Sequence, residues 1–220
     1  MILKTLCDML FKQIKVGPMQ NFSYIIGDEK TREAAVVDVG WEVDKLIETA
    51  NKEKLKINKT ILTHSHYDHV QKVDELASKT NSIVYFHEAD YNEIKKMIKN
   101  TDLKLVKLKN NDKIAVGNIQ IKVIHAPGHA PGAICLFVEN KLITGDTLFV
   151  NAIGRTDLAG GDSIKLFESL QKLRKLSDNV EVYPGHDYGE IPSSTIGNEK
   201  KNNPYFKCET KEQFLGLVGR

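Results

Sequence analysis

The segment THSHYDHV, residues Thr63–Val70, packs three histidines and an aspartate into six consecutive positions, directly after an expected buried strand. In extended backbone, side chains two residues apart point the same way, so His64 and His66 are expected to bind one metal ion together. Asp68 and His69 follow where the chain turns toward a helix, and we expect them to face a neighbouring ion position. Imidazole and carboxylate ligands suit zinc, iron or manganese. The alternative, a polar loop that is His-rich by chance, is disfavoured by this density of histidines.

Three later segments repeat one pattern, a strand followed by a glycine-containing turn that bears one potential ligand. APGHAPG supplies His129, TGDTLF supplies Asp146, and YPGHDYG supplies His186. Glycine lets the backbone bend sharply next to a metal. Each residue alone would fit an ordinary turn. Together with the first segment, they predict strand ends that share one edge of a sheet and converge on a metal site.

This pattern predicts a site for two divalent ions. The expected ligands are His64, His66 and His129 for the first ion, Asp68, His69 and His186 for the second, and Asp146 as the bridge between them. Two ions about 3.5–4 Å apart bring a bound water to a pKa near 7 and polarise an attacked carbonyl. We therefore expect a bridging hydroxide as nucleophile, with Asp68 and Asp146 as the catalytic carboxylates and no serine or cysteine nucleophile.

Short strand-like runs alternate with helical segments, and many neighbouring strands are joined by short turns. This favours mixed sheets over a purely parallel, doubly wound sheet. The expected strands cover residues 12–16, 23–26, 34–38, 59–63, 83–86, 114–116, 119–124, 133–138, 141–144 and 180–183. The expected helices cover residues 42–54, 70–78, 89–99, 163–176 and 194–201. No repeat or composition break divides the chain, so we expect a single domain over residues 1–220.

The charge balance argues against a nucleic-acid partner, because 31 basic and 29 acidic residues give a net charge of +2. The lysine-rich run 95–113 is interrupted by Asp102 and Asp112 and is interpreted as a solvated face. No apolar run reaches the length of a membrane span. We expect a cytoplasmic protein without a membrane partner, since the N-terminal residues 1–16 lack a signal-peptide layout.

The three cysteines, Cys7, Cys135 and Cys208, are odd in number and widely spaced. They form no CxxC pair and no disulfide framework, which favours a reducing compartment. Cys135 lies in the apolar run AICLFV and is expected to be a buried core thiol.

The ligand order HxHxDH, then His, Asp and His, resembles that of the metallo-β-lactamase superfamily over nearly the whole chain. This resemblance implies an α+β fold, an αβ/βα four-layer sandwich with the metal site at one edge. Within the superfamily, the chain is similar to the glyoxalase II and persulfide dioxygenase branch. The motifs that carry this similarity are GDTLF (Gly145–Phe149), GRTDLAGGD (Gly154–Asp162), PGHDYG (Pro184–Gly189) and TIGNEKKNNP (Thr195–Pro204).

The resemblance to glyoxalase II implies a metal-dependent hydrolase that cleaves a thioester such as a hydroxyacylglutathione, with Tyr188 helping to bind the thiol substrate. Two departures qualify the likeness. Val70 and Gln71 follow His69 where glyoxalase II often has two glycines. The chain also stops too soon after His186 for the helical extension that grips glutathione in eukaryotic-type glyoxalase II. Shorter glyoxalase-like hydrolases are therefore the closer comparison.

The resemblance to persulfide dioxygenase implies a different reaction with one iron, held by His64, His129 and Asp146, while Arg155 supports the substrate. An ion pair between Arg155 and Asp157 that only stabilises the loop is the structural alternative. Another hydrolase of the same fold also fits. A non-enzymatic role requires the loss of a ligand position, and none of the seven is missing. The expected partner is a small-molecule thioester or thiol-derived substrate, and the exposed loops around the site leave room for a homodimer.

Four other polar residues are not expected to bind metal directly. His87 follows a strand and precedes a helix, so helix capping or a surface position is expected. His125 is either a turn residue or a group behind the metal ligands. Asp187 either orients a ligand or shapes its turn. Asp38 ends a strand and is a candidate support for the metal-binding loop.

Overall fold

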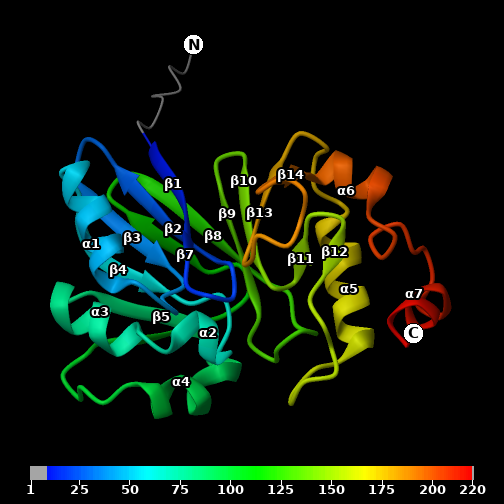
Figure 1. Ribbon diagram of the computed structural model, residues 1–220, viewed down its shortest axis with the longest axis horizontal. Coiled ribbons are helices and arrows are strands. Elements are labelled where there is room, and N and C mark those ends of the chain that lie inside the picture. The colour runs from blue at the N-terminus through cyan, green and yellow to red at the C-terminus, as the bar shows by residue number, and fades with distance from the viewer. Residues whose placement is uncertain (1–8, 220) are drawn as a thin grey trace.

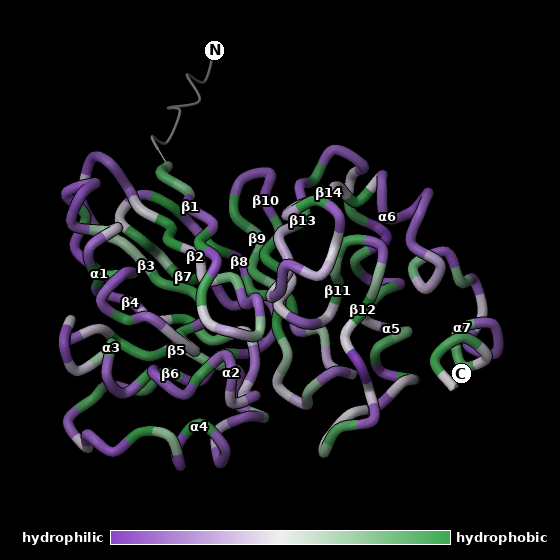
Figure 2. Tube along the Cα trace, viewed as in Figure 1, coloured by the Kyte–Doolittle hydropathy of each residue, from purple (hydrophilic) through white to green (hydrophobic). Residues whose placement is uncertain are grey.

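The computed structural model describes residues 9–219, which form two six-stranded sheets packed face to face, with helices on both outer faces (Figure 1). The expected α+β sandwich of four layers, helix, sheet, sheet and helix, is confirmed. Figure 2 shows the hydrophobic residues concentrated along the strands inside this arrangement.

The N-terminal sheet has the order β1-β2-β3-β4-β5-β6. Its first three strands are antiparallel, whereas β3 to β6 run parallel to one another. The strands are β1 (Met9–Val16), β2 (Asn21–Asp28), β3 (Glu33–Val37), β4 (Lys56–Ile61), β5 (Ile83–His87) and β6 (Leu105–Leu108). The helices on this side are α1 (Val43–Lys52), α2 (Tyr67–Val70), α3 (Val73–Thr80), the 3-10 turn η1 (Glu88–Asp90) and α4 (Tyr91–Met97).

The C-terminal sheet has the order β14-β13-β10-β9-β8-β7 and is also mixed, since only β10 and β13 pair in parallel. Its strands are β7 (Lys113–Val116), β8 (Ile119–His125), β9 (Ile134–Val138), β10 (Lys141–Gly145), β13 (Glu181–Pro184) and β14 (Ser194–Thr195). A small ribbon is formed by β11 (Leu148–Phe149) and β12 (Ala152–Ile153). The helices here are α5 (Ser163–Leu173), α6 (Ile196–Asn202) and α7 (Lys211–Val218).

The layers follow from strands that are apolar on both faces. In β3, Ala35 and Val37 pack between the two sheets, whereas Ala34 and Val36 pack under α1. This alternation is the two-residue period of a strand, and burial on both faces explains the unbroken apolar run. Cys135 of β9 is fully buried under α5, which confirms the expected core thiol.

Four ligand-bearing loops lie at one edge of the sandwich. β8, β10 and β13 all run in the same direction, so the loops that follow them leave the sheet at the same end. The loop after β4 meets them there, since Ile134 at the start of β9 donates its N–H to the Thr63 carbonyl at 2.8 Å. A backbone bond from Phe22 N–H to the Gly185 carbonyl, also 2.8 Å, joins the sheets at this edge.

The predicted start of the helix at residues 70–78 is wrong. α2 ends at Val70, and α3 begins only at Val73. The backbone between them pairs with Val39, which donates to the His69 carbonyl at 2.7 Å and accepts from Lys72 N–H at 3.0 Å. These tertiary hydrogen bonds interrupt the helix and hold the metal-binding loop against β3.

Other boundaries differ by a few residues. The helix expected at residues 89–99 begins as η1 and ends at Met97, because the Asp74 carboxylate accepts the N–H groups of Lys99 and Asn100. The helix expected at 194–201 begins only at Ile196, since Ser194 and Thr195 form strand β14. Strand β6 and helix α7 were not expected from the sequence pattern.

No helix within residues 9–219 is long and apolar enough to span a membrane. Cys7 and the first half of the N-terminal segment 1–16 considered for a signal peptide lie outside the described residues.

Candidate metal centre

The structure brings all seven predicted ligands together at the edge where the loops meet. Their donor atoms form three overlapping groups, each within 4.8 Å. The groups are His64, His66 and His129, here called the first triad; Asp68, His69 and His186, here called the second triad; and His64, His69 and Asp146, which connects the two. The two triads contain the same residues as the two ligand sets expected from the sequence, and the binding of an ion at each remains a prediction.

The first triad is oriented by backbone and hydroxyl groups. His129 Nδ1 donates to the Arg155 carbonyl at 2.7 Å, so its Nε2 carries a lone pair in the neutral ring. That lone pair faces His66 Nδ1 at 2.8 Å. His64 Nδ1 lies 3.1 Å from the Thr63 hydroxyl, which leaves His64 Nε2 directed into the site.

The second triad is oriented by acceptors that fix both of its imidazole rings. His69 Nδ1 donates to Asp38 Oδ2 at 2.9 Å, and His186 Nδ1 donates to the Met19 carbonyl at 2.9 Å. When deprotonated, these rings present lone pairs at Nε2, and the two nitrogens are only 3.1 Å apart. His186 Nε2 also lies 3.2 Å from Asp68 Oδ2. Lone pairs and negative charge gathered in this way favour a cation among them.

Asp146 lies between the triads. Its Oδ1 is 3.3 Å from His69 Nε2, and its Oδ2 is 3.3 Å from His186 Nε2 and 3.5 Å from His129 Nε2. Within residues 9–219, Asp146 Oδ1 and His64 Nε2 are buried without a hydrogen-bond partner. Buried polar atoms are normally satisfied, so these two fit groups that bind an ion instead.

The surroundings of the two triads lower the pKa values of His64 and His66 and raise those of His69 and His186. Burial lowers the pKa of His64 well below its usual range, and burial with nearby His129 lowers the pKa of His66 to about 4. Burial also acts on His69 and His186, but carboxylates outweigh it. Asp146 and Asp38 raise the pKa of His69, and hydrogen bonds to Asp146 and Asp68 raise that of His186 to about 9.

Asp38 supports the loop that carries the first ligands. Its Oδ1 accepts the Thr63 N–H at 2.7 Å, and its Oδ2 accepts the Thr63 hydroxyl at 2.7 Å as well as His69 Nδ1. Asp38 itself has a φ of 56°, a left-handed conformation that Asp and Asn adopt more readily than most residues. The expected supporting role of Asp38 is therefore confirmed.

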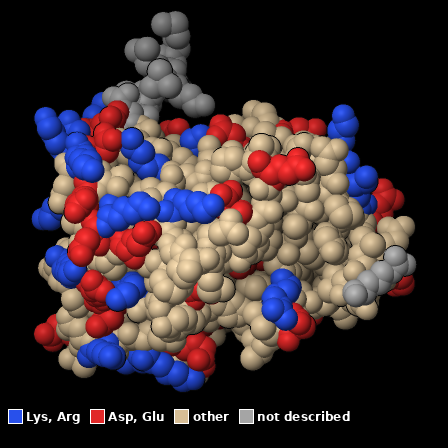
Figure 3. All heavy atoms as spheres, viewed as in Figure 1, with Lys and Arg blue, Asp and Glu red and all other residues tan. Residues whose placement is uncertain are grey.

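A cavity of about 560 Å³ opens beside the triads, and its wall is largely apolar and aromatic. The lining residues include Met19, Phe149, Ile153, Leu158 and Tyr188, together with five of the seven clustered residues. No Ser or Cys is among the described residues that line it. On the face shown in Figure 3, charged side chains gather mainly on the left, whereas the central surface is mostly uncharged.

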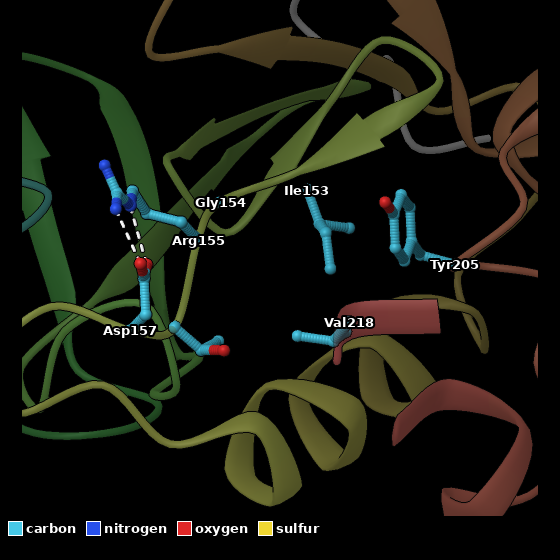
Figure 4. A pocket seen from close by; sticks show the side chains of 7 residues that line it. Ile153, Gly154, Arg155, Asp157, Tyr205 and Val218 are labelled. Carbon is cyan, nitrogen blue, oxygen red and sulfur yellow. Dashed lines mark hydrogen bonds and ion pairs between the residues drawn. The ribbon is translucent and has the colours of Figure 1, made fainter. Parts of the chain in front are cut away.

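Tyr188 and Arg155, the predicted substrate-binding residues, both line this cavity. The Tyr188 ring stacks on His186 at 4.5 Å and is 54% exposed, so it is free to contact a bound molecule. The Arg155 guanidinium instead forms a two-bond ion pair with Asp157, each bond 2.6 Å long (Figure 4). The ion pair that the sequence suggested is therefore present.

A second cavity, of about 370 Å³, shares Ile153, Gly154 and Arg155 with the first. Figure 4 shows its other side, where Tyr205 and Val218 of the C-terminal segment face Ile153. The segment around Arg155 thus separates two hollows.

The remaining polar residues contribute to structure. His87 Nδ1 accepts the Ala89 N–H at 3.3 Å, which confirms the expected capping role. His125 stacks on His87 at 3.8 Å and contacts the Pro131 carbonyl, as a turn residue would. Asp187 forms an ion pair with Lys15 at 2.8 Å and so shapes its loop.

Sequence reasoning missed Asn21 and Trp41. Asn21 Nδ2 donates to Asp68 Oδ2 at 2.8 Å, and Trp41 Nε1 donates to Asn21 Oδ1 at 3.1 Å. Neither residue stands in a metal-binding motif. Asn21 directly follows a turn and begins β2, and nothing local distinguishes it from an ordinary turn residue.

Comparison with known proteins identifies the family. The family model for the metallo-beta-lactamase superfamily matches residues 16–186, which contain all seven clustered residues. The chain belongs to the metallo-beta-lactamase superfamily.

Members of this superfamily with similar sequence and structure span most of the chain. A probable polyketide biosynthesis zinc-dependent hydrolase of Bacillus subtilis, PksB, is 34% identical over 89% of this chain and 85% of its own length. The crystal structure of ETHE1 from Myxococcus xanthus has a TM-score of 0.86 and 29% identity, covering 96% of this chain and 91% of ETHE1. A di-iron-bound form of TTHA1623 has a TM-score of 0.77 and 30% identity, covering 88% of this chain and 99% of TTHA1623.

These likenesses and the side-chain cluster support an enzyme of the metallo-hydrolase type that uses divalent metal. The superfamily assignment also agrees with the order of strands, helices and clustered residues along the chain.

Proposed function

We propose that this protein is a dinuclear metal hydrolase that cleaves a small-molecule thioester, such as a hydroxyacylglutathione. The observation that carries the two-ion part of the proposal is the second triad. His69 and His186 present Nε2 atoms 3.1 Å apart because acceptors fix both Nδ1 positions, and Asp68 adds a carboxylate beside them. A reaction with a single ion at the first triad would leave this arrangement without its cation.

Each triad would hold one divalent ion, zinc, iron or manganese, and Asp146 would contact both. When bound, two such ions lower the pKa of a water to near 7 and polarise a substrate carbonyl. Asp68 and Asp146 are well placed to orient that water, because both carboxylates lie within 3.3 Å of His186 Nε2. Burial lowers the pKa of His64 and His66, so these two imidazoles stay neutral and add no competing positive charge.

The cavity wall supplies the surface that a thioester would need. Phe149 and Ile153 offer apolar contacts for an acyl or thiol arm, and Tyr188 adds an exposed aromatic ring beside His186. Arg155 also lines the cavity, and its guanidinium is held in the ion pair with Asp157. Thiol-derived substrates suit a reducing cellular compartment such as the cytoplasm, which the odd number and wide spacing of the cysteines favour.

The test combines metal content per chain, measured on protein purified without added metal, with hydrolysis of S-lactoylglutathione. We expect nearly two metal ions per chain and turnover. The variant His66→Ala should lose turnover while its circular dichroism stays that of the wild type, and His125→Ala serves as the matched histidine control. Full activity of His66→Ala would refute the proposal.

A second candidate is a dioxygenase with one iron, supported by the likeness to ETHE1. The iron would sit on His64, His129 and Asp146, of which His129 Nε2 and Asp146 Oδ2 are 3.5 Å apart. Oxygen uptake with glutathione persulfide, together with one iron per chain and no thioester turnover, would favour this candidate. An iron-loaded protein that consumes no oxygen would exclude it.

A further inference from the structure

The second triad is supported by a side chain from another strand that belongs to no ligand motif. Asn21 is the first residue of β2 and is only 2% exposed. Because β2 runs antiparallel to β3, this end of β2 lies at the edge where the loop after β3 leaves the sheet. An isolated bridge between Asn21 and His186 holds the backbone there.

The Asn21 amide contacts every member of the second triad. Its Nδ2 donates to Asp68 Oδ2 at 2.8 Å and lies 3.3 Å from the Asp68 carbonyl oxygen. The same nitrogen is 3.5 Å from the Nε2 atoms of both His69 and His186. No such contact joins Asn21 to the first triad in the described part of the chain.

Trp41 determines the orientation of the Asn21 side-chain amide. An indole N–H can only donate, so the atom that faces Trp41 Nε1 at 3.1 Å must be the amide oxygen of Asn21. The amide nitrogen is then directed at Asp68. With the amide reversed, its oxygen would face the Asp68 carboxylate, and two acceptors would repel each other.

Close packing holds Trp41 in this position. A Cβ atom added to Gly17 would come within 2.2 Å of the Trp41 ring, and Gly17 has a φ of +64°. The turn between β1 and β2 is thus shaped so that the indole fits over it. Trp41 is also the single tryptophan of the chain, so its fluorescence reports on this place alone.

We propose that Asn21, oriented by Trp41, is a positioning residue that sets the affinity of the second triad for its ion and leaves the first triad nearly unaffected. The amide bonds to Asp68 Oδ2, the oxygen that also lies 3.2 Å from His186 Nε2, and so holds this carboxylate in place beside the two imidazoles. Partners of this kind typically change metal affinity by about 10- to 100-fold. The inference rests on the proposed function, since it takes the second triad as an ion site.

The experiment titrates metal-free protein with Zn²⁺ and follows Trp41 fluorescence, with bound zinc measured after equilibrium dialysis. Wild-type protein should bind two equivalents, and the fluorescence should change with the equivalent that fills the second triad. In Asn21→Ala, the affinity for that equivalent should fall about 10- to 100-fold, whereas the affinity for the other should stay within about twofold. Asn51→Ala, on the exposed face of α1, is the matched control.

Trp41→Phe provides an independent test that keeps Asn21 in place. It removes the indole N–H and retains an aromatic ring, so the amide is free to reverse. We expect a smaller loss of affinity for one zinc equivalent, up to about tenfold, by dialysis. This variant also decides the question if Asn21→Ala does not fold.

The outcomes separate the two proposals. If both variants bind two zinc ions with wild-type affinities, the role of Asn21 is refuted and the dinuclear site stands. If both affinities fall equally, Asn21 supports the whole edge and the selective role is refuted. If wild-type protein never binds a second equivalent, the dinuclear function itself fails.

Discussion

The two triads contain similar ligand atoms but lie in different surroundings. The first triad consists of three imidazoles that bond to the neutral Thr63 hydroxyl and Arg155 carbonyl, and its His129 also lies 3.5 Å from Asp146. The second has a carboxylate ligand, and Asp38 and Asn21 bond directly to its members. Burial lowers the pKa of His64 and His66 in the first triad, whereas carboxylates raise the pKa of His69 and His186 in the second.

This difference indicates that the triads depend on different parts of the fold. The first is oriented by the loops that carry its own ligands and by the segment after β12. The second depends on β2, on the end of β3 and on the Met19 carbonyl in the turn before β2. Substitutions at these supports should therefore affect the ions unequally, and substitutions at the shared carboxylate should affect both.

The largest effect is expected for a substitution at Asp146. Because both triads contact Asp146, this substitution should affect both ions instead of one. Asp146→Ala should lower kcat/KM by at least about 10³-fold and reduce the metal content below two ions per chain. Hydrolysis of S-lactoylglutathione and elemental analysis measure these losses. Asp162→Ala, at the N-cap of α5, is the aspartate control. Turnover near the wild-type rate in Asp146→Ala would remove Asp146 from the site.

The next largest effect is expected for Asp38→Asn, which tests how far the second triad depends on the hydrogen bond from His69 to Asp38. Asparagine tolerates the left-handed backbone at this position, but its amide N–H₂ must face a donor from Thr63 or His69. We expect metal affinity to fall about 10- to 100-fold and stability to fall by about 1–3 kcal/mol. Zinc titration and urea unfolding of metal-free protein measure the two effects. Unchanged values for both would show that Asp38 is dispensable.

A smaller effect, on KM, is expected at the two cavity residues Tyr188 and Arg155. Tyr188 stacks on His186, whereas the Arg155 side chain is bonded to Asp157 and only its carbonyl orients His129. Tyr188→Ala should raise KM for the thioester by about tenfold with unchanged metal content. Arg155→Ala should behave like Asp157→Ala, with a KM close to that of the wild type. A rise in KM for Arg155→Ala alone would instead assign substrate contact to the guanidinium.

The smallest effect is expected at Asp28, which lies far from both triads. A substitution there should change stability but not metal binding. Burial alone would raise the pKa of Asp28, but N–H groups of Asn118 and Lys30 lower it to about 2. A pKa below the unfolded value of about 3.8 stabilises the protein above pH 4, and this contribution disappears as the pH falls toward 2.

Asp28→Asn should therefore cost about 1 kcal/mol at pH 6, and the gap to the wild type should close between pH 4 and pH 2. Urea unfolding of metal-free protein at several pH values measures the gap. A gap that stays constant down to pH 2 would contradict the low pKa of Asp28. Turnover at neutral pH should equal that of the wild type.

The sequence by itself predicted which seven side chains would cluster at one edge of the fold. His64 and His66 are two residues apart in extended backbone, and His129, Asp146 and His186 each follow a strand and a glycine. These are local patterns, and local backbone geometry decides where such side chains point. The short turns between neighbouring strands also predicted mixed sheets, whereas the four-layer sandwich was implied by the resemblance to the metallo-β-lactamase superfamily.

Only the tertiary structure decided what supports the ligands. Asn21 meets Asp68 because β2 lies beside β3, and Met19 meets His186 because the two sheets join at one edge. The break between α2 and α3 arises from backbone bonds to Val39. These contacts join residues far apart in the chain, and their geometry depends on strand pairing and sheet packing, which no sequence period records.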